Sequence, residues 1–223
     1  MKLNIEKNDL LQWIRYTAGL AICGFVIYCL TKTELGLAPW EILSKGISMH
    51  CPLSFGQVII AVSVVVFIID LLMKEVIGVG MILDTILVGV FVDLFTWLDL
   101  MPAFNGYIVK ICVYIAGLVF MGLAQYLCMS SGQGLGPRDT LIVGTGKRLR
   151  GIPIGAVQMG ILVMVFLGGW MLGGPVGPGT VLSVALLGPA LQLWCGIFHF
   201  EPRDISNKSL LDYIRIDKND HLC

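Results

Sequence analysis

The stretch that decides the fold is written twice in this chain. Its first copy reads Leu35-Gly-Leu-Ala-Pro-Trp-Glu-Ile-Leu-Ser-Lys-Gly46, and its second copy, 98 positions later, reads Gln133-Gly-Leu-Gly-Pro-Arg-Asp-Thr-Leu-Ile-Val-Gly144. The same offset links four earlier residues to later ones: Tyr16, Gly19, Gly24 and Tyr28 recur as Tyr114, Gly117, Gly122 and Tyr126. Beyond the quoted stretch the matches continue at an offset of 99, as for Gly56 with Gly155 and Gly89 with Gly188. So many matches in one register indicate an internal duplication.

The composition places both copies in lipid. Hydrophobic residues make up 57% of the 223 residues and charged residues 13%, and the mean hydropathy is +0.86. A helix needs about 20 mainly apolar residues to cross a bilayer. Six segments meet this condition, three in each copy: 11–30, 56–73, 76–98, 107–129, 152–171 and 180–200. The sequence therefore predicts an all-α, polytopic membrane protein with repeats at 11–98 and 107–200, an N-terminal segment at 1–10 and a polar tail at 201–223.

The basic residues predict the orientation of the six spans. With the N-terminus inside, every one of the 15 Lys and Arg residues except Lys32, Lys45 and Lys110 falls on the inner side. Because such residues accumulate on the cytoplasmic side, we expect a protein of the cell membrane with both termini in the cytoplasm. Each copy has three spans, so the second copy enters from the opposite side and the two form inverted repeats, an architecture of many transporters.

The duplicated stretch predicts a short helix after the first span of each copy. Proline favours the first position of a helix, and a carboxylate in the first turn complements its positive end. Pro39 with Glu41, and Pro137 with Asp139, fit this pattern, and we expect each helix to stop at Gly46 or Gly144. Helices of two or three turns are too short to span the membrane. They either dip into the protein from opposite faces, where their beginnings meet near the midplane, or lie at the surface as amphipathic linkers.

The two copies differ at one position where binding chemistry is expected. Trp40 of the first copy is replaced by Arg138 in the second. A guanidinium presents a fork of donors suited to carboxylate and phosphate oxygens, so Arg138 is a candidate anchor for an anionic group of a substrate. The alternatives are a structural cation paired with a carboxylate, or one more member of the basic cluster that sets the topology.

Ionisable residues within spans are costly in lipid and are therefore candidates for function. Asp84 lies in the third span, and its counterpart is Ser183, so a charge breaks the symmetry there; a coupling role and a helix-packing role both remain open. Asp70 and Asp93 lie near span ends, where solvation at the interface is sufficient to explain them. The paired tyrosines line a polar cavity or form interhelical hydrogen bonds. Together these arguments predict a substrate site that includes Trp40, Glu41, Arg138, Asp139, Asp84, Tyr28 and Tyr126.

Enzyme chemistry has almost no support in this sequence. The seven cysteines and three histidines show no metal-ligand spacing, and the phosphate-binding, nucleophile-elbow and dinucleotide-binding motifs do not occur. We expect no cofactor, no bound metal and no nucleic acid. The expected partners are the lipid bilayer, an unknown small-molecule substrate and either a second copy of the chain or an accessory protein.

Three glycine-rich motifs resemble those of a known family. They are Gly-Leu-Ala-Pro-Trp at 36–40, Gly-Leu-Gly-Pro-Arg-Asp at 134–139 and Gly-Gly-Pro-Val-Gly-Pro-Gly-Thr at 173–180. The chain resembles the YczE/YyaS/YitT group of bacterial integral membrane proteins, nearest to the YczE-like branch. The resemblance implies the fold and the location but no settled activity. The favoured function is a small-molecule secondary transporter or exporter, with an anionic or zwitterionic metabolite as the candidate substrate class. A passive channel and a non-transporting accessory, regulatory or substrate-binding subunit are the alternatives.

Overall fold

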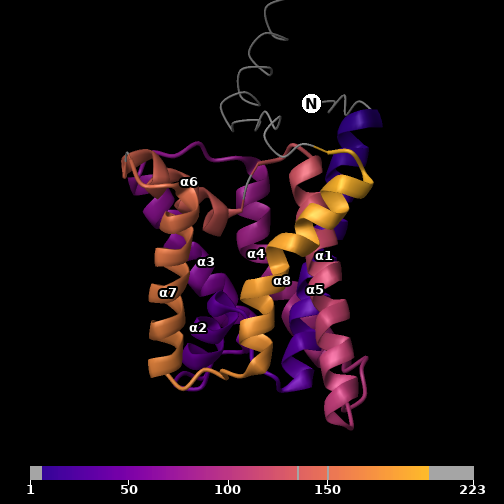
Figure 1. Cartoon of the computed structure of the whole chain (residues 1–223). Helices are drawn as coiled ribbons and strands as arrows, with labels where there is room; N and C mark the ends of the chain where they lie inside the picture. Colours follow the sequence, from indigo (N-terminus) through magenta and orange to yellow (C-terminus); the bar gives the residue numbers. More distant parts are fainter. Residues whose placement is uncertain (1–6, 135, 150, 201–223) are drawn as a thin grey trace, which may run out of the picture.

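The protein is all-helical throughout the part of the chain that the computed structural model describes, residues 7–134, 136–149 and 151–200 (Figure 1). Its eight helices are α1 (Lys7–Thr33), α2 (Pro39–Ser48), α3 (Phe55–Leu72), α4 (Val79–Leu98), α5 (Tyr107–Ser130), α6 (Pro137–Arg148), α7 (Ile154–Met171) and α8 (Pro178–Ile197). The predicted all-α class is confirmed. The first helix begins within the segment expected as the N-terminus, at Lys7, and the expected tail at 201–223 lies outside the described residues.

Among the residues that the structure describes, five helices are long and apolar enough to cross a membrane: α1, α3, α4, α5 and α8. The sequence predicted six spans. The remaining predicted span, 152–171, corresponds to α7, whose apolar part Gly155–Met171 is shorter than the others. In Figure 1, α1 begins and α8 ends at the same end of the bundle, which we call the N-terminal end. Helix α6 lies towards this end, and α2 lies towards the opposite end.

The two short helices begin where the sequence predicted. Ala38 and Gly136 are extended N-cap residues, and Pro39 and Pro137 follow as the first helical residues. Both helices continue past the predicted ends, so the predicted stops at Gly46 and Gly144 are wrong. The reason is tertiary packing, because a side chain at the first of these glycines would press on the α7 backbone and one at the second would press on the side chain of Glu75.

Most of α2 is buried, including Pro39, Trp40, Glu41 and Ile42. Ile42 is completely inaccessible and belongs to an apolar cluster with Leu35 and Leu37 of the preceding loop and Tyr114 of α5. A surface linker would expose its polar face, so the alternative of an amphipathic surface segment is wrong for α2. The buried face of α6 is smaller and consists of Pro137, Thr140 and Gly144.

Matched hydrogen bonds hold the two loops that precede the short helices. The Leu35 carbonyl before α2 accepts from Gly179 N at 2.8 Å, and the Gln133 carbonyl before α6 accepts from Gly80 N at 3.1 Å. The next residue in each loop, Gly36 or Gly134, has a φ of +103° or +111°, a backbone conformation that favours glycine. Each loop is thereby fixed to the first turn of a helix in the other copy, and these bonds set the positions at which α2 and α6 begin.

Candidate functional site

The site lies where α2 and α6 begin, and an ion pair joins the two helices there. Arg138 Nη1 lies 2.7 Å from Glu41 Oε1, and the guanidinium carbon lies 5.3 Å from the centre of the Trp40 ring. The exposed fractions of the Arg138 and Glu41 side chains are 22% and 10%. The sequence singled out all three residues, and the structure brings them together across the two copies.

The ion pair satisfies two charges that would otherwise be costly at this depth in the protein. Removing a carboxylate or a guanidinium from water is unfavourable by several kcal/mol, and only close pairing with further polar contacts offsets it. The Trp40 face adds a cation–π contact to Arg138. Each charge therefore depends on the other, and any ligand that displaces one partner has to supply a replacement charge.

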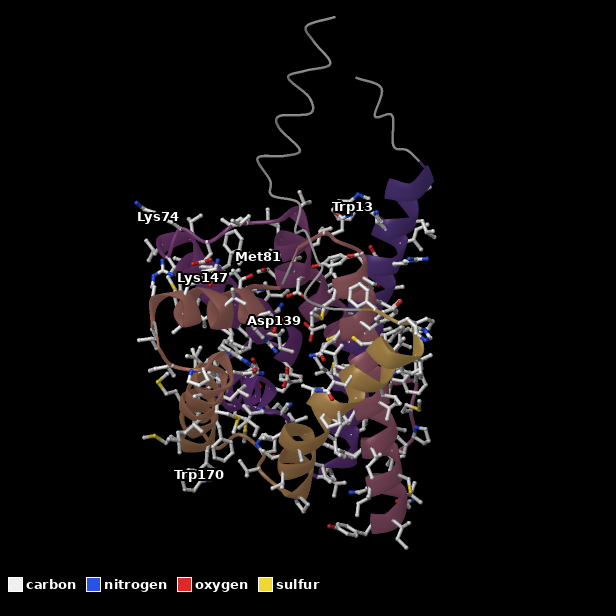
Figure 2. All side chains as sticks on the ribbon, turned by 45° about the horizontal axis from the view of Figure 1, so that its top comes forward. Trp13, Lys74, Met81, Asp139, Lys147 and Trp170 are labelled. Carbon is white, nitrogen blue, oxygen red and sulfur yellow. The ribbon has the colours of Figure 1, made fainter. Side chains whose placement is uncertain are left out.

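Two further carboxylates lie beside this pair. A Cβ atom built on Gly136, the N-cap of α6, would lie 2.8 Å from Asp84 Oδ2, so the Asp84 carboxylate contacts the positive end of α6. Asp139 lies in the first turn of α6, has an exposed side chain and appears near the middle of the molecule in Figure 2. Within the described part of the chain, neither Asp84 nor Asp139 forms an ion pair. The site thus has one arginine against three carboxylates.

The two predicted tyrosines lie away from the ion pair. The Tyr28 hydroxyl donates to Asp99 Oδ1 at 3.1 Å and accepts from Met101 N at 3.1 Å. Tyr126 instead stacks on Phe198, with ring centres 4.7 Å apart. The two contacts correspond under the internal duplication, because Tyr126 is the counterpart of Tyr28 and Phe198 is the counterpart of Asp99. One end of the bundle therefore has a polar contact where the other has an aromatic stack.

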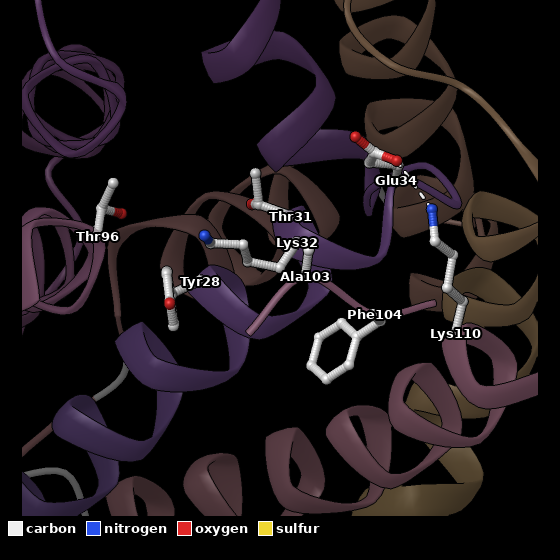
Figure 3. Close-up of a pocket in the computed structure, with 8 residues that line it drawn as sticks. All are labelled: Tyr28, Thr31, Lys32, Glu34, Thr96, Ala103, Phe104 and Lys110. Atoms are coloured by element: carbon white, nitrogen blue, oxygen red, sulfur yellow. Dashed lines mark hydrogen bonds and ion pairs between the residues drawn. The ribbon is translucent and has the colours of Figure 1, made fainter. Parts of the chain in front are cut away.

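A cavity of about 300 Å³ lies beside Tyr28 at the end of the bundle opposite the N-terminal end (Figure 3). Its lining residues are Tyr28, Thr31, Lys32, Glu34, Thr96, Ala103, Phe104 and Lys110. Lys110 pairs with Glu34 at 2.8 Å, and Lys32 pairs with Asp99. The lysine partners lower the pKa of both carboxyl groups from their usual range. Tyr28 thus both lines a cavity and forms hydrogen bonds between segments, and this cavity is separate from the Glu41–Arg138 pair.

The sequence missed a carboxylate that holds the far end of α6. Glu75, in the loop between α3 and α4, binds Lys147 Nζ through Oε2 at 2.7 Å and Arg148 Nη1 through Oε1 at 3.0 Å. Arg148 also donates to the carbonyls of Met73 and Gly144. Lys147 and Arg148 were interpreted only as topology signals, and no sequence pattern indicates which acid they meet. Figure 2 shows Lys74 and Lys147 on the same side of the molecule.

Glu75 gives a pH prediction. Its hydrogen bonds with Lys147 and then Arg148 lower the pKa of the carboxyl group from its usual value, about 4.3. The ion pairs therefore stabilise the folded protein fully above that value and are lost as the pH falls through the lowered pKa. We expect Glu75→Gln to lower the Tm in detergent by roughly 2–4 °C at pH 7, and the difference from wild type to shrink as the pH falls below the usual value and through the lowered pKa.

The control for this measurement is Glu34→Gln, which removes a carboxylate that is 77% exposed. Exposed pairs contribute little, so the control should stay close to the wild-type Tm at every pH. A difference between Glu75→Gln and wild type that stays constant to the lowest pH at which wild type remains folded would contradict the role of the ionised carboxylate.

Asp70 differs from its predicted environment. Interface solvation was expected, but the residue is completely inaccessible near the end of α3. Neither carboxylate oxygen has a hydrogen-bond partner among the described residues. The interpretation as a solvated span end is therefore wrong, because α3 packs against both α4 and α6 and this residue is buried within the helix bundle.

Comparison with known proteins supports the predicted family. Residues 10–196 match the model of a family of unknown function (DUF6198). An uncharacterized membrane protein of Bacillus subtilis (strain 168), YczE, is 32% identical over 84% of this chain and 87% of its own length. An uncharacterized protein of Haemophilus influenzae is 29% identical over 80% of this chain and 81% of its own length. The uncharacterized protein YyaS of Bacillus subtilis is 27% identical over 84% of this chain and 94% of its own length. No solved structure matches.

Proposed function

Because the chain belongs to the family of unknown function DUF6198, we propose its function from the site itself: a secondary transporter or exporter of a small metabolite in the cell membrane. The proposed topology has six spans, α1, α3, α4, α5, α7 and α8, arranged as two inverted repeats. Helices α2 and α6 are the re-entrant helices of the two repeats. Both termini face the cytoplasm, so the N-terminal end of the bundle is the cytoplasmic end.

Contacts at matched positions support the inverted arrangement. The Leu35 to Gly179 and Gln133 to Gly80 hydrogen bonds are equivalent under the internal offset. Tyr16 donates to the Gly80 carbonyl at 2.6 Å, and a Cβ atom on Gly179 would lie 2.5 Å from the ring of its counterpart, Tyr114. Equivalent tyrosines thus lie against equivalent helix beginnings in the two copies, as expected if the copies are structural repeats.

The observation that carries the transport proposal is the Glu41–Arg138 ion pair between the two short helices. A zwitterionic metabolite can replace this pair without leaving a charge unmatched: its carboxylate binds Arg138 and its ammonium group binds Glu41. Trp40 then offers an apolar face to the body of the substrate. Binding separates the two helix beginnings without the cost of an unpaired charge, which is a requirement for a site that opens and closes.

Asp84 and Asp139 are the proposed groups for a coupling cation. They lie beside the beginning of α6 and, in the described residues, are not neutralised by an ion pair. A proton or sodium ion bound there would offset the excess of carboxylates over arginine. The coupled carrier therefore requires both the Glu41–Arg138 pair and at least one of these aspartates.

Ligand-dependent thermal stabilisation of the detergent-purified protein tests this proposal. The panel contains amino acids, organic anions, nucleosides, vitamins and polyamines. A ligand at about 100 times its Kd stabilises the folded state by roughly 2.7 kcal/mol, which is readily detected. We expect an amino-acid-like zwitterion to stabilise wild type and the Lys45→Gln control, which removes a cation elsewhere on α2, but not Arg138→Gln. Uptake into liposomes should then depend on a proton or sodium gradient.

Other results would replace the proposal. Flux of the ligand that ignores both gradients would indicate a passive channel. A ligand that binds Arg138→Gln as well as wild type would place the site elsewhere. No ligand in the whole panel, together with a stoichiometric partner that copurifies from the membrane, would support an accessory or regulatory subunit.

A further inference from the structure

Two helix interfaces that correspond under the internal duplication are packed very differently. Helices α3 and α4 cross through a pair of glycines: a Cβ atom on Gly56 would lie 2.1 Å from the Gly89 carbonyl oxygen, and one on Gly89 would lie 2.4 Å from the Gly56 carbonyl oxygen. Their counterparts, Gly155 on α7 and Gly188 on α8, would have no atom of the described residues within 4 Å of such a Cβ. The first interface is closed at backbone contact, and the second is open.

A polar contact holds the closed interface. Asp93 of α4 accepts a 2.8 Å hydrogen bond from Gly56 N through Oδ1 and a second bond from the Ser54 hydroxyl through Oδ2. Ser54 is also the N-cap of α3, where it accepts from Gln57 N at 3.1 Å. One carboxylate thus ties α4 to the first turn of α3, at the end of the bundle opposite the N-terminal end.

The open interface lacks the groups for such a contact. The residue that corresponds to Asp93 is Gln192, and the residue that corresponds to Ser54 is Pro153, which has neither a hydroxyl nor a backbone N–H. Helix α8 runs away from α7 towards the N-terminal end of the bundle in Figure 1. Asp139, at the beginning of α6, is exposed, and Arg138 and Asp84 are partly exposed. These three side chains thus retain some exposure in the state in which the α3–α4 interface is shut.

We propose that the α3–α4 and α7–α8 interfaces are the two gates of the transporter and that this structure is the state with the α7–α8 gate open. In the second state, Gly155 and Gly188 pack as Gly56 and Gly89 do here, and the Asp93 contact with Ser54 and Gly56 is broken. The inference rests on the proposed function and adds the gates, their glycine contacts and the residue that biases them. Under the proposed topology, the open state faces the cytoplasm.

Asp93 sets the balance between the two states in this scheme. Its two hydrogen bonds exist only when the α3–α4 gate is closed, and Gln192 with Pro153 offers nothing equivalent to the other gate. A hydrogen bond to a charged acceptor changes an equilibrium by roughly tenfold or more. The state described here is therefore the preferred one, and removal of the Asp93 carboxylate shifts the population towards the second state by roughly that factor.

Distance measurements between spin labels test the two gates directly. Four exposed residues form matched pairs: Leu53 with Leu94 across the first gate, and Ile152 with Leu193 across the second. Each pair is changed to cysteine in a variant whose native cysteines are replaced and whose thermal unfolding matches wild type. In liposomes without added ligand, we expect a short, narrow distance for the first pair and a longer one for the second.

Asp93→Leu should then add a long component to the first pair and a short component to the second. The milder variant Ser54→Ala should do the same to a smaller extent, and it serves if Asp93→Leu fails to fold. Gln192→Leu is the matched control and should change neither distance. Unchanged distances in both Asp93→Leu and Ser54→Ala, or a change in the first pair alone, would overturn the proposal of two opposed gates.

Flux measured in the same vesicles separates this inference from the proposed function. Transport without any change in the two distances would refute the gates and leave the transporter. If the two distances change in opposite directions but the protein transports no substrate from the panel, the transporter proposal is refuted and the two gates remain.

Discussion

Arg138→Gln is expected to lower the free energy of unfolding by about 3 to 5 kcal/mol, because it leaves the Glu41 carboxylate without its partner in a buried site. The Glu41 side chain is only 10% exposed, and its ion pair with Arg138 measures 2.7 Å. Glu41→Gln should be similarly harmful, since it leaves the guanidinium unpaired against Trp40. Denaturant or thermal unfolding in detergent, followed by tryptophan fluorescence, measures both variants.

The double variant Glu41→Gln, Arg138→Gln distinguishes a paired charge from two independent contributions. With both charges removed, no buried ion remains, so we expect the double variant to be more stable than either single variant. Lys110→Gln is the control, because it breaks an exposed pair with Glu34 that contributes little. Additive losses in the double variant would show that Glu41 and Arg138 do not stabilise each other, and would remove the observation on which the transport proposal rests.

The second large effect is expected at a matched pair of helix glycines, Gly89 and Gly188. Gly89→Ala places a methyl group 2.4 Å from the Gly56 carbonyl oxygen and 2.5 Å from Ile60 Cγ1. The backbone oxygen cannot move unless α3 and α4 separate, so we expect a loss of about 3 kcal/mol, at the upper end of the usual cost of overpacking. Gly188→Ala adds the same group where the described residues leave open space, and improved helix propensity should leave stability unchanged or raised by up to about 1 kcal/mol.

Gly188 should behave differently when transport is measured. A larger side chain there fits the state described here but prevents α7 and α8 from closing on each other. We therefore expect Gly188→Leu to fold with nearly wild-type stability and to lose substrate flux. Equal destabilisation by Gly89→Ala and Gly188→Ala would show that the two interfaces are packed alike, contrary to the difference described above.

The sequence predicted the all-α class and the beginnings of the two short helices in the duplicated stretch, because local rules determine both. Pro39 and Pro137 favour the first position of a helix, and the residues before them are extended. The ends of these helices were missed since Gly46 and Gly144 are glycines for packing rather than for termination. That distinction depends on which part of the fold packs against each glycine. The neighbouring residues in the sequence do not indicate it.

The residues of the candidate site were singled out one by one in the sequence, but their arrangement was not predicted. Arg138 and Glu41 were both singled out, yet Arg138 was assigned to an anionic ligand and its pairing with a carboxylate remained one alternative among several. The partner lies 97 positions away in the other copy. The Glu75 contacts with Lys147 and Arg148 were missed for the same reason. The environment of Asp70 was predicted wrongly because closeness to a span end does not measure burial, and this residue is completely inaccessible in the folded protein.

The ion pair between the two copies also bears on how the protein is made. Glu41 leaves the ribosome almost a hundred residues before Arg138, so its carboxylate is made well before its partner in the folded protein. Helix α2 cannot take its final place at that stage without burying this charge alone. The pairing of Glu41 with Arg138 can therefore form only after residue 138 has been made, and residues 11–98 produced on their own should remain a substrate for membrane quality control until residues 107–200 are supplied in trans.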